Sequence, residues 1–139
     1  MAAIREVFSS GPELDRDAAI AQVAHAAGFR RTGSRITEAI DSGLIAAVRR
    51  RIVRSQRGLL SIDCRNVGDY PRDLLMSSLL AAMGFAWRER EEGIRVAARR
   101  LGFRRTGSSI RDAFKSVING AIRRGLIETD GKLIRKTRS

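Results

Sequence analysis

The sequence predicts a mainly α-helical protein with small β-hairpins, an α+β fold arranged as two similar copies. Three observations predict it. A seven-residue motif occurs twice, apolar residues recur at helical spacing around both occurrences, and each copy closes with two short apolar runs separated by a Gly-containing turn.

The repeated motif is Gly28-Phe-Arg-Arg-Thr-Gly-Ser34, which recurs letter for letter as Gly102-Phe-Arg-Arg-Thr-Gly-Ser108, 74 residues later. At this offset residues 20–60 match residues 94–134 at 16 of 41 positions without a gap. Two copies are too few for a solenoid, so we interpret the repeat as a duplicated small domain. Gly, Asn, Asp and Pro residues punctuate the middle of the chain. We therefore expect one copy over residues 1–66, a linker over 67–72 and a second copy over 73–139.

Local signals in the first copy predict three helices. Apolar spacing predicts a helix over residues 4–8, and Asp15 or Asp17 can cap a second helix, which Gly28 ends. Ser34 can cap a third helix, whose apolar residues follow an i, i+4 series: Ile36, Ile40, Leu44 and Val48.

The second copy repeats this order. Residues 74–83 and 91–101 supply two helices, and Ser108 or Ser109 can cap a third, with an apolar face of Ile110, Phe114, Ile118 and Ile122. Each third helix is followed by a hairpin, with a turn at Gln56-Arg57-Gly58 in the first copy and at Asp130-Gly131 in the second. Three helices followed by a hairpin are the plan of a winged helix-turn-helix domain, and we expect two in tandem.

Composition limits the function. Of 139 residues 43% are hydrophobic, enough for a core, and 27 Lys and Arg against 15 Asp and Glu give a formal net charge of +12. Such a charge indicates a polyanionic partner, most often nucleic acid. One Cys and one His permit neither an internal disulfide nor a His/Cys metal cluster, and no GxxxxGK[ST] phosphate loop occurs. We expect no enzyme activity, no cofactor, no metal and no small-molecule substrate.

Targeting signals are also lacking in the sequence. The longest apolar segment, residues 74–85, is too short to span a bilayer and contains two serines. No signal-peptide pattern begins the chain. We expect no membrane association and a cytoplasmic setting, with nucleoid association if the source is bacterial.

The repeated Arg-Arg-Thr-Gly-Ser stretch has the chemistry of a phosphate site. Arginine grips phosphate with two donors, hydroxyls add donors, and helix N-terminal amides attract anions. Gly33 and Gly107 would permit a positive φ and close approach of the backbone. We expect phosphate contacts from Arg30, Arg31, Thr32, Ser34, Arg104, Arg105, Thr106 and Ser108. The two serines could instead act as helix caps alone, and Phe29 and Phe103 are expected in the core.

The third helices and the hairpins differ between copies. The third helix of the first copy has a face of mixed charge, with Arg35 a candidate contact beside Glu38 and Asp41. The second copy offers Ser109, Arg111, Lys115 and Asn119, and Arg and Asn side chains pair bidentately with guanine and adenine. We expect this helix to read the groove. The hairpin of the first copy is more basic, so Arg54 and Arg57 are expected to hold phosphates.

The Leu74–Met83 helix is apolar on more than one face, whereas a surface helix needs only one stripe. We expect the extra face either to pack the two copies together or to join a second chain, as a homodimer or with another protein. The residues expected there are Leu75, Leu79, Met83 and Trp87.

The stretch Gly28-Phe-Arg-Arg-Thr-Gly-Ser-Arg-Ile36 resembles the winged-helix region near the C-terminal end of large bacterial superfamily-1 helicase proteins that carry nuclease-like domains. Those regions have a similar Arg-x-Gly-Ser-Arg-Ile turn entering a helix. The resemblance covers roughly residues 15–62 and 90–136, and the second copy departs at Ser109, where the first has Arg35. It implies a non-catalytic nucleic-acid-binding or partner-docking module of a DNA-processing or defence system, as a fragment or as a stand-alone relative.

Two functions therefore stay open. The first is binding of double-stranded DNA by both modules, with the repeated turns and the first hairpin gripping phosphates. The alternative is a winged-helix interaction module that docks a protein partner of a larger complex.

Overall fold

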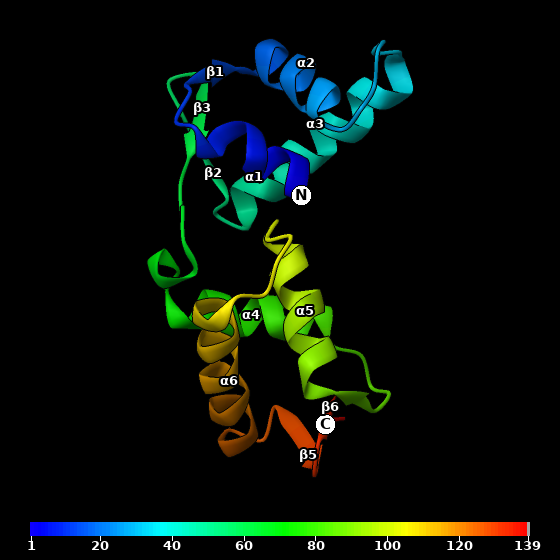
Figure 1. Cartoon of the computed structure of the whole chain (residues 1–139), viewed down its shortest axis with the longest axis vertical. Coiled ribbons are helices and arrows are strands. Elements are labelled where there is room, and N and C mark those ends of the chain that lie inside the picture. The colour runs from blue at the N-terminus through cyan, green and yellow to red at the C-terminus, as the bar shows by residue number, and fades with distance from the viewer. Residues whose placement is uncertain (139) are drawn as a thin grey trace. The chain divides into compact units, whose positions relative to one another are not determined.

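The chain divides into two compact units in the computed structural model, which describes residues 1–138 (Figure 1). The first unit is Met1–Arg65 and the second begins at Asn66. Both units have the same order of elements, in which a helix and a short strand precede two helices and a final pair of strands. The predicted α+β class, mainly helical with small β-hairpins, is confirmed at this level.

The first unit starts with α1 (Ala2–Ser9), β1 (Leu14–Asp15) and α2 (Arg16–Ala26). It continues with α3 (Ser34–Arg49), β2 (Val53–Gln56) and β3 (Leu59–Ile62). Asp15 caps α2 as predicted, because its carboxylate accepts a hydrogen bond of 2.8 Å from the Ala18 amide. The three helices pack their apolar faces against one another and against the sheet.

The sheet of the first unit has three antiparallel strands in the order β1-β3-β2. The β2–β3 hairpin closes through Arg57 and Gly58, whose φ angles of 54° and 78° suit a tight hairpin turn. The prediction of a two-stranded hairpin is therefore incomplete. It missed β1 because a strand of two residues is too short to display an alternating pattern.

The second unit begins with η1 (Val67–Asp69), α4 (Arg72–Ala82), β4 (Arg88–Glu89) and α5 (Arg90–Arg100). It continues with α6 (Ser108–Arg123), β5 (Ile127–Asp130) and β6 (Leu133–Lys136), and its sheet order is β4-β6-β5. Asp130 pairs with Leu133, so the turn consists of Gly131 and Lys132, one residue later than predicted.

The segment 67–72, expected as a linker, is folded into the second unit. Asn66 and Asp69 cap η1 reciprocally, with the Asn66 amide donating to the Asp69 carboxylate at 2.9 Å. Val67 and Tyr70 are buried, and the Tyr70 ring meets Phe103 edge to face at a centroid distance of 6.5 Å. Apolar burial therefore orders a stretch whose composition suggested a loop.

The buried phenylalanine of the core lies on a different helix in each unit. Phe8 of α1 is fully buried, and the equivalent position of α4 holds Ala82. Conversely, Phe114 of α6 is fully buried, and the equivalent position of α3 holds the smaller Ile40. A fully buried phenylalanine thus comes from the first helix in one unit and from the third helix in the other, where the buried Tyr70 adds a second ring. Such exchanges between helices preserve packing while the sequences diverge.

Helix α4 does not present its extra apolar face to a partner. Leu75, Leu79 and Met83 are buried, and α4 packs against both α5 and α6 within its own unit. A helix held between two others needs an apolar surface on both sides, which explains the sequence pattern. The predicted partner surface is therefore wrong for these three residues. Trp87 alone of the predicted set lies exposed, with 39% of its surface accessible.

Candidate nucleic-acid interface

The repeated turn leads from one helix into the next in both units. Helices α2 and α5 end at Gly28 and Gly102, whose φ angles of 91° and 82° favour glycine. The next amide folds back, as the Phe29 N–H donates to the Ala24 carbonyl at 2.9 Å, and the second unit repeats this bond. The chain then exposes both arginine pairs: Arg30, Arg31, Arg104 and Arg105. Thr32 is exposed as well, and Thr106 is half-buried.

The serines after the turn are not helix caps, which corrects the prediction for Ser34, Ser108 and Ser109. Gly33 and Gly107 occupy the N-cap positions, and neither helix has a side-chain cap hydrogen bond. Their φ angles of −79° and −75° lie in extended space, so the expected positive φ is also wrong. Ser34 and Ser108 are instead the first residues of α3 and α6, with exposed side chains. The first-turn amides of α3 and α6 therefore receive no cap from a side chain.

The phenylalanines of the two turns differ in burial. Phe103 is half-buried beside Tyr70, whereas Phe29 has 47% of its surface exposed. The expectation that both fill the core is wrong for Phe29. The two identical turn sequences differ in their surroundings, because Tyr70, which follows η1, packs against Phe103 in the turn of the second unit.

The exposed face of α6 carries polar and basic side chains and one exposed carboxylate, that of Asp112. Ser109, Lys115 and Asn119 are exposed, and Arg123 extends the face by one further turn. Arg111 lies at the margin of this face, half-buried, with its Nε 3.2 Å from the Glu91 carboxylate of α5. A partly solvated pair of this kind is weak, so Arg111 keeps most of its capacity to bind a phosphate.

The corresponding face of α3 is less suited to DNA. Arg35 and Glu38 are exposed. Asp41 forms an ion pair with Arg16 of α2. The Arg16 guanidinium donates a hydrogen bond to the Asp41 carboxylate, which raises the pKa of Arg16. Ile45 stands where α6 has Asn119, and 44% of its surface is exposed. An open groove of about 290 Å³ runs beside it, lined chiefly by apolar side chains from α3 and the sheet.

The hairpin turns also differ. Arg57 is exposed at the tip of the first hairpin, and Arg54 is exposed on the strand before it, where its Nε donates to Ser61 Oγ at 3.3 Å. The second hairpin offers Lys132 at its tip. Both hairpins therefore end in at least one cation on a two-residue turn.

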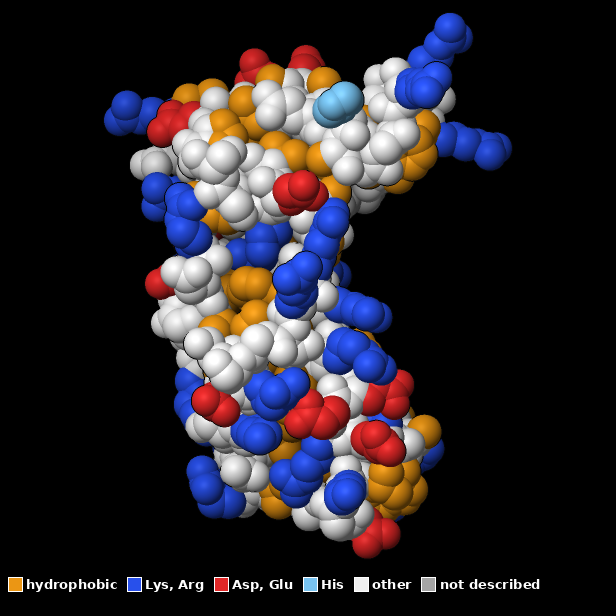
Figure 2. Space-filling view, viewed as in Figure 1, with side chains coloured by type: hydrophobic (Ala, Val, Ile, Leu, Met, Phe, Trp, Pro, Cys, Tyr) orange, Lys and Arg blue, Asp and Glu red, His pale blue; other side chains and the backbone are white. Residues whose placement is uncertain are grey.

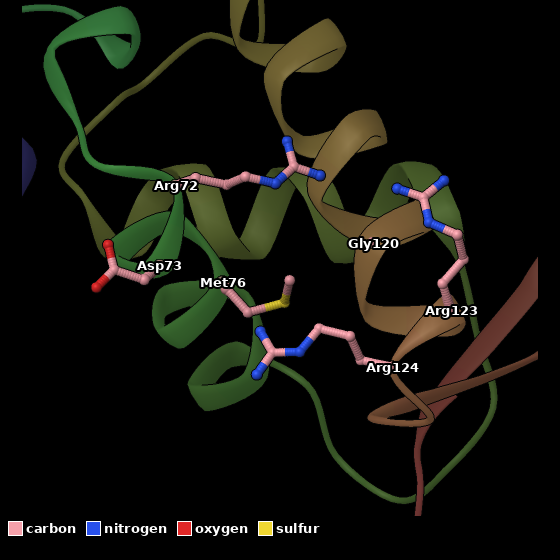
Figure 3. Close-up of a pocket in the computed structure, with 6 residues that line it drawn as sticks. All are labelled: Arg72, Asp73, Met76, Gly120, Arg123 and Arg124. Atoms are coloured by element: carbon pink, nitrogen blue, oxygen red, sulfur yellow. The ribbon is translucent and has the colours of Figure 1, made fainter.

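Three arginines that the sequence analysis did not single out gather around one pocket of the second unit (Figure 3). Arg72 begins α4, and Arg123 and Arg124 end α6; the pocket measures about 500 Å³. Arg72 donates to both the hydroxyl and the carbonyl of Ser116, at 2.8 Å each. Gly120 makes room for this, because a Cβ there would lie 2.9 Å from an Arg72 nitrogen. The sequence does contain an indication of two of these arginines, because Arg49-Arg50 of the first copy recurs as Arg123-Arg124 in the second.

The second unit carries the larger share of the charge. Its segment has 16 basic and 8 acidic residues, a formal charge of +8, against 11 and 7, or +4, for the first. Lys and Arg side chains are spread over the visible surface of this unit, with acidic ones among them (Figure 2). Over residues 1–138 no helix is long and apolar enough to cross a membrane, and no cluster of three or more His, Cys, Asp or Glu side chains could hold a metal.

Comparison with known proteins identifies no family model that matches the chain, and no similar protein among the curated sequences or the solved structures. The arrangement itself therefore carries the functional argument. In the second unit it brings an exposed arginine turn, an uncapped helix start and a polar helix face into one continuous stretch, residues 104–119.

Proposed function

We propose that the chain binds double-stranded DNA without catalysis, through two winged helix-turn-helix units. In each unit the helix, strand, two helices and two strands follow one another in the order of a winged helix, and the first strand pairs with the last. In this arrangement α3 and α6 are the recognition helices, and the β2–β3 and β5–β6 hairpins are the wings.

The observation that carries the proposal is the exposed face of α6 beside the Arg104-Arg105 turn. A recognition helix contacts bases with the residues near its N-terminus, while residues before it hold the phosphate backbone. Ser109 is exposed in the first turn of α6, and Lys115 and Asn119 are exposed on the same face further along the helix, in its middle and second half. Asn can pair bidentately with adenine, and Lys and Arg neutralise phosphates. The net charge of +8 in this unit favours approach to a polyanion.

The proposal is tested by fluorescence anisotropy with a labelled random-sequence duplex. We expect the Lys115→Ala/Asn119→Ala variant to bind at least tenfold more weakly than the parent chain, on the order of the loss of one phosphate contact plus one polar contact. Arg95→Ala/Arg99→Ala is the control, because both residues are exposed on α5 and not on α6, and their loss removes two positive charges instead of one. If the control weakens binding as much as the α6 variant, general charge and not α6 drives the interaction.

The exposed Ile45 and its groove favour a second candidate function for the first unit, the docking of a protein partner. An apolar residue at the centre of a recognition face has little to offer a phosphate backbone, whereas it suits a protein surface. This candidate predicts that Arg30→Ala/Arg31→Ala leaves duplex affinity within about twofold of the parent, while Arg104→Ala/Arg105→Ala lowers it strongly. Equal losses in the two variants would show that both units bind DNA.

The resemblance to helicase-associated winged-helix regions is compatible with both candidates. We propose accordingly that the chain serves a DNA-processing or defence system as a binding or docking module. Its contribution would be to position a polyanion or a partner, since the residues discussed hold no group with an obvious catalytic role.

A further inference from the structure

The second unit carries an exposed aromatic surface that the duplex interface does not use. Phe85 and Trp87 lie between α4 and β4, and 45% and 39% of their surfaces are exposed. Contiguous exposed apolar surface often marks a binding site, whereas single exposed apolar residues do not. Trp87 is also the only tryptophan of the sequence.

Three cations surround these rings. The guanidinium carbon of Arg135 lies 4.3 Å from the centroid of the Trp87 ring, and that of Arg138 lies 4.8 Å from the centroid of the Phe85 ring. The ammonium of Lys136 is 5.7 Å from the Phe85 centroid. These are cation–π distances, and they fix charged groups directly beside flat apolar surfaces. We call these five residues the aromatic platform.

The strands of the second unit hold the aromatic platform in place. The Lys136 amide donates to the Gly84 carbonyl at 3.0 Å, which ties the end of β6 to the segment before Phe85. Arg135 also forms an ion pair of 2.7 Å with Glu128 on the neighbouring strand. Backbone and side-chain bonds thus position the rings and cations before any ligand arrives, which lowers the entropic cost of binding.

We propose that the aromatic platform binds unpaired bases of single-stranded nucleic acid. Bases stack on aromatic rings and on guanidinium planes, and nearby cations hold the phosphates between them. The platform combines two exposed rings with three positive charges, of which that of Arg135 is paired with Glu128. Such a set suits a chain of flat rings joined by anions. It shares no residue with the α6 face, so it stands or falls independently of duplex binding.

The fluorescence of Trp87 provides a direct test of this proposal. Stacking of a base against the indole quenches its fluorescence, and no other tryptophan contributes to the signal. We expect the full chain to show saturable quenching with a short oligothymidylate. An abasic strand of equal length has the same phosphates without bases, so we expect it to bind at least tenfold more weakly and to quench little. Equal affinity for both strands would overturn the proposal, because charge alone would then explain the binding.

Substitution separates the platform from general charge. Phe85→Ala keeps the reporter and removes one exposed ring, and we expect about tenfold weaker binding of oligothymidylate. Arg138→Ala, which removes a cation over that ring, should weaken binding more than Arg95→Ala, which removes an equal charge from α5. An unchanged thermal denaturation curve shows that each variant is folded. Equal effects of the two arginine variants would contradict the proposal.

Aromatic and basic side chains also occur together at membrane surfaces. Vesicles of phosphatidylserine and phosphatidylcholine distinguish this case. We expect no blue shift of Trp87 emission on adding them. A blue shift with vesicles, without quenching by oligothymidylate, would refute the nucleic-acid assignment in favour of a lipid surface.

Discussion

Removal of the arginine pair in the second repeated turn has an effect on DNA binding that can be worked out in advance. Arg104 and Arg105 are both exposed at the start of α6, so each can neutralise one phosphate. Each neutralised phosphate of duplex DNA contributes about −0.9 to the slope of log K against log salt concentration. Arg104→Ala/Arg105→Ala should therefore make the slope shallower by about 1.8. Over a tenfold range of salt, this difference corresponds to about 60-fold in affinity.

The assay is anisotropy of a labelled duplex at several salt concentrations. The parent chain, the Arg104→Ala/Arg105→Ala variant and the Arg95→Ala/Arg99→Ala control are compared, because both variants lose two positive charges from the second unit. At low salt the turn variant should bind far more weakly, and near 1 M salt its curve should meet that of the parent. An unchanged slope, or an equal change in the control, would refute the phosphate clamp at this turn.

Three further predictions concern stability and are checked by thermal or urea denaturation. Ser34→Ala should change the free energy of unfolding by less than about 0.5 kcal/mol, whereas Asp15→Ala should lower it by about 1 kcal/mol. The reason is that Asp15 caps a helix and Ser34 does not. A larger loss for Ser34→Ala than for Asp15→Ala would contradict the cap assignment. Leu79→Ala should cost about 2–5 kcal/mol, because Leu79 is fully buried between helices, and a surface-exposed Leu79 would show almost none of this loss. Ser78→Ala should stabilise the second unit by about 1 kcal/mol, because the buried Ser78 hydroxyl has no hydrogen-bond partner among the described residues; destabilisation would reveal a partner.

The sequence predicted those features of the fold that depend on residues close together in the chain. The Gly28 and Gly102 helix ends follow from backbone freedom, and the Asp15 cap follows from its position before an apolar stripe. The first hairpin was found with a turn one residue too long, because Gln56, predicted in the turn, pairs with Leu59 at the end of β2. The duplication supported the two glycine helix ends, which occur in both units, but not the Asp15 cap, since Glu89 at the equivalent position makes no cap hydrogen bond.

What the sequence could not supply depends on packing between distant segments. The burial of Leu75, Met76 and Leu79 on α4 needs knowledge of where α5 and α6 lie. The contrast between Phe29 and Phe103 arises from Tyr70, which lies 33 residues before Phe103 in the numbering. The serine caps failed for a local reason, because α3 and α6 start one residue earlier than a serine cap requires, with Gly33 and Gly107 at the N-cap positions.

The sequence identified candidate site residues, but it did not show which of them lie close together in the structure. The exposed positions Lys115 and Asn119 follow from helical periodicity alone. The pairing of Arg111 with Glu91 and the pocket around Arg72 do not, because both join different helices. The aromatic platform escaped notice for the same reason, as it combines a loop after α4 with the end of β6.

Amide chemical shifts of the full chain, followed by NMR during titration with a short duplex, locate the surface that contacts DNA. We expect the largest changes in the Arg104–Gly107 turn and on the exposed face of α6, at Ser109, Lys115 and Asn119. Amides of the buried core, such as that of Leu79, should move little. Changes confined to the first unit, or none at all at low salt, would contradict the claim that α6 and its arginine turn form the duplex interface.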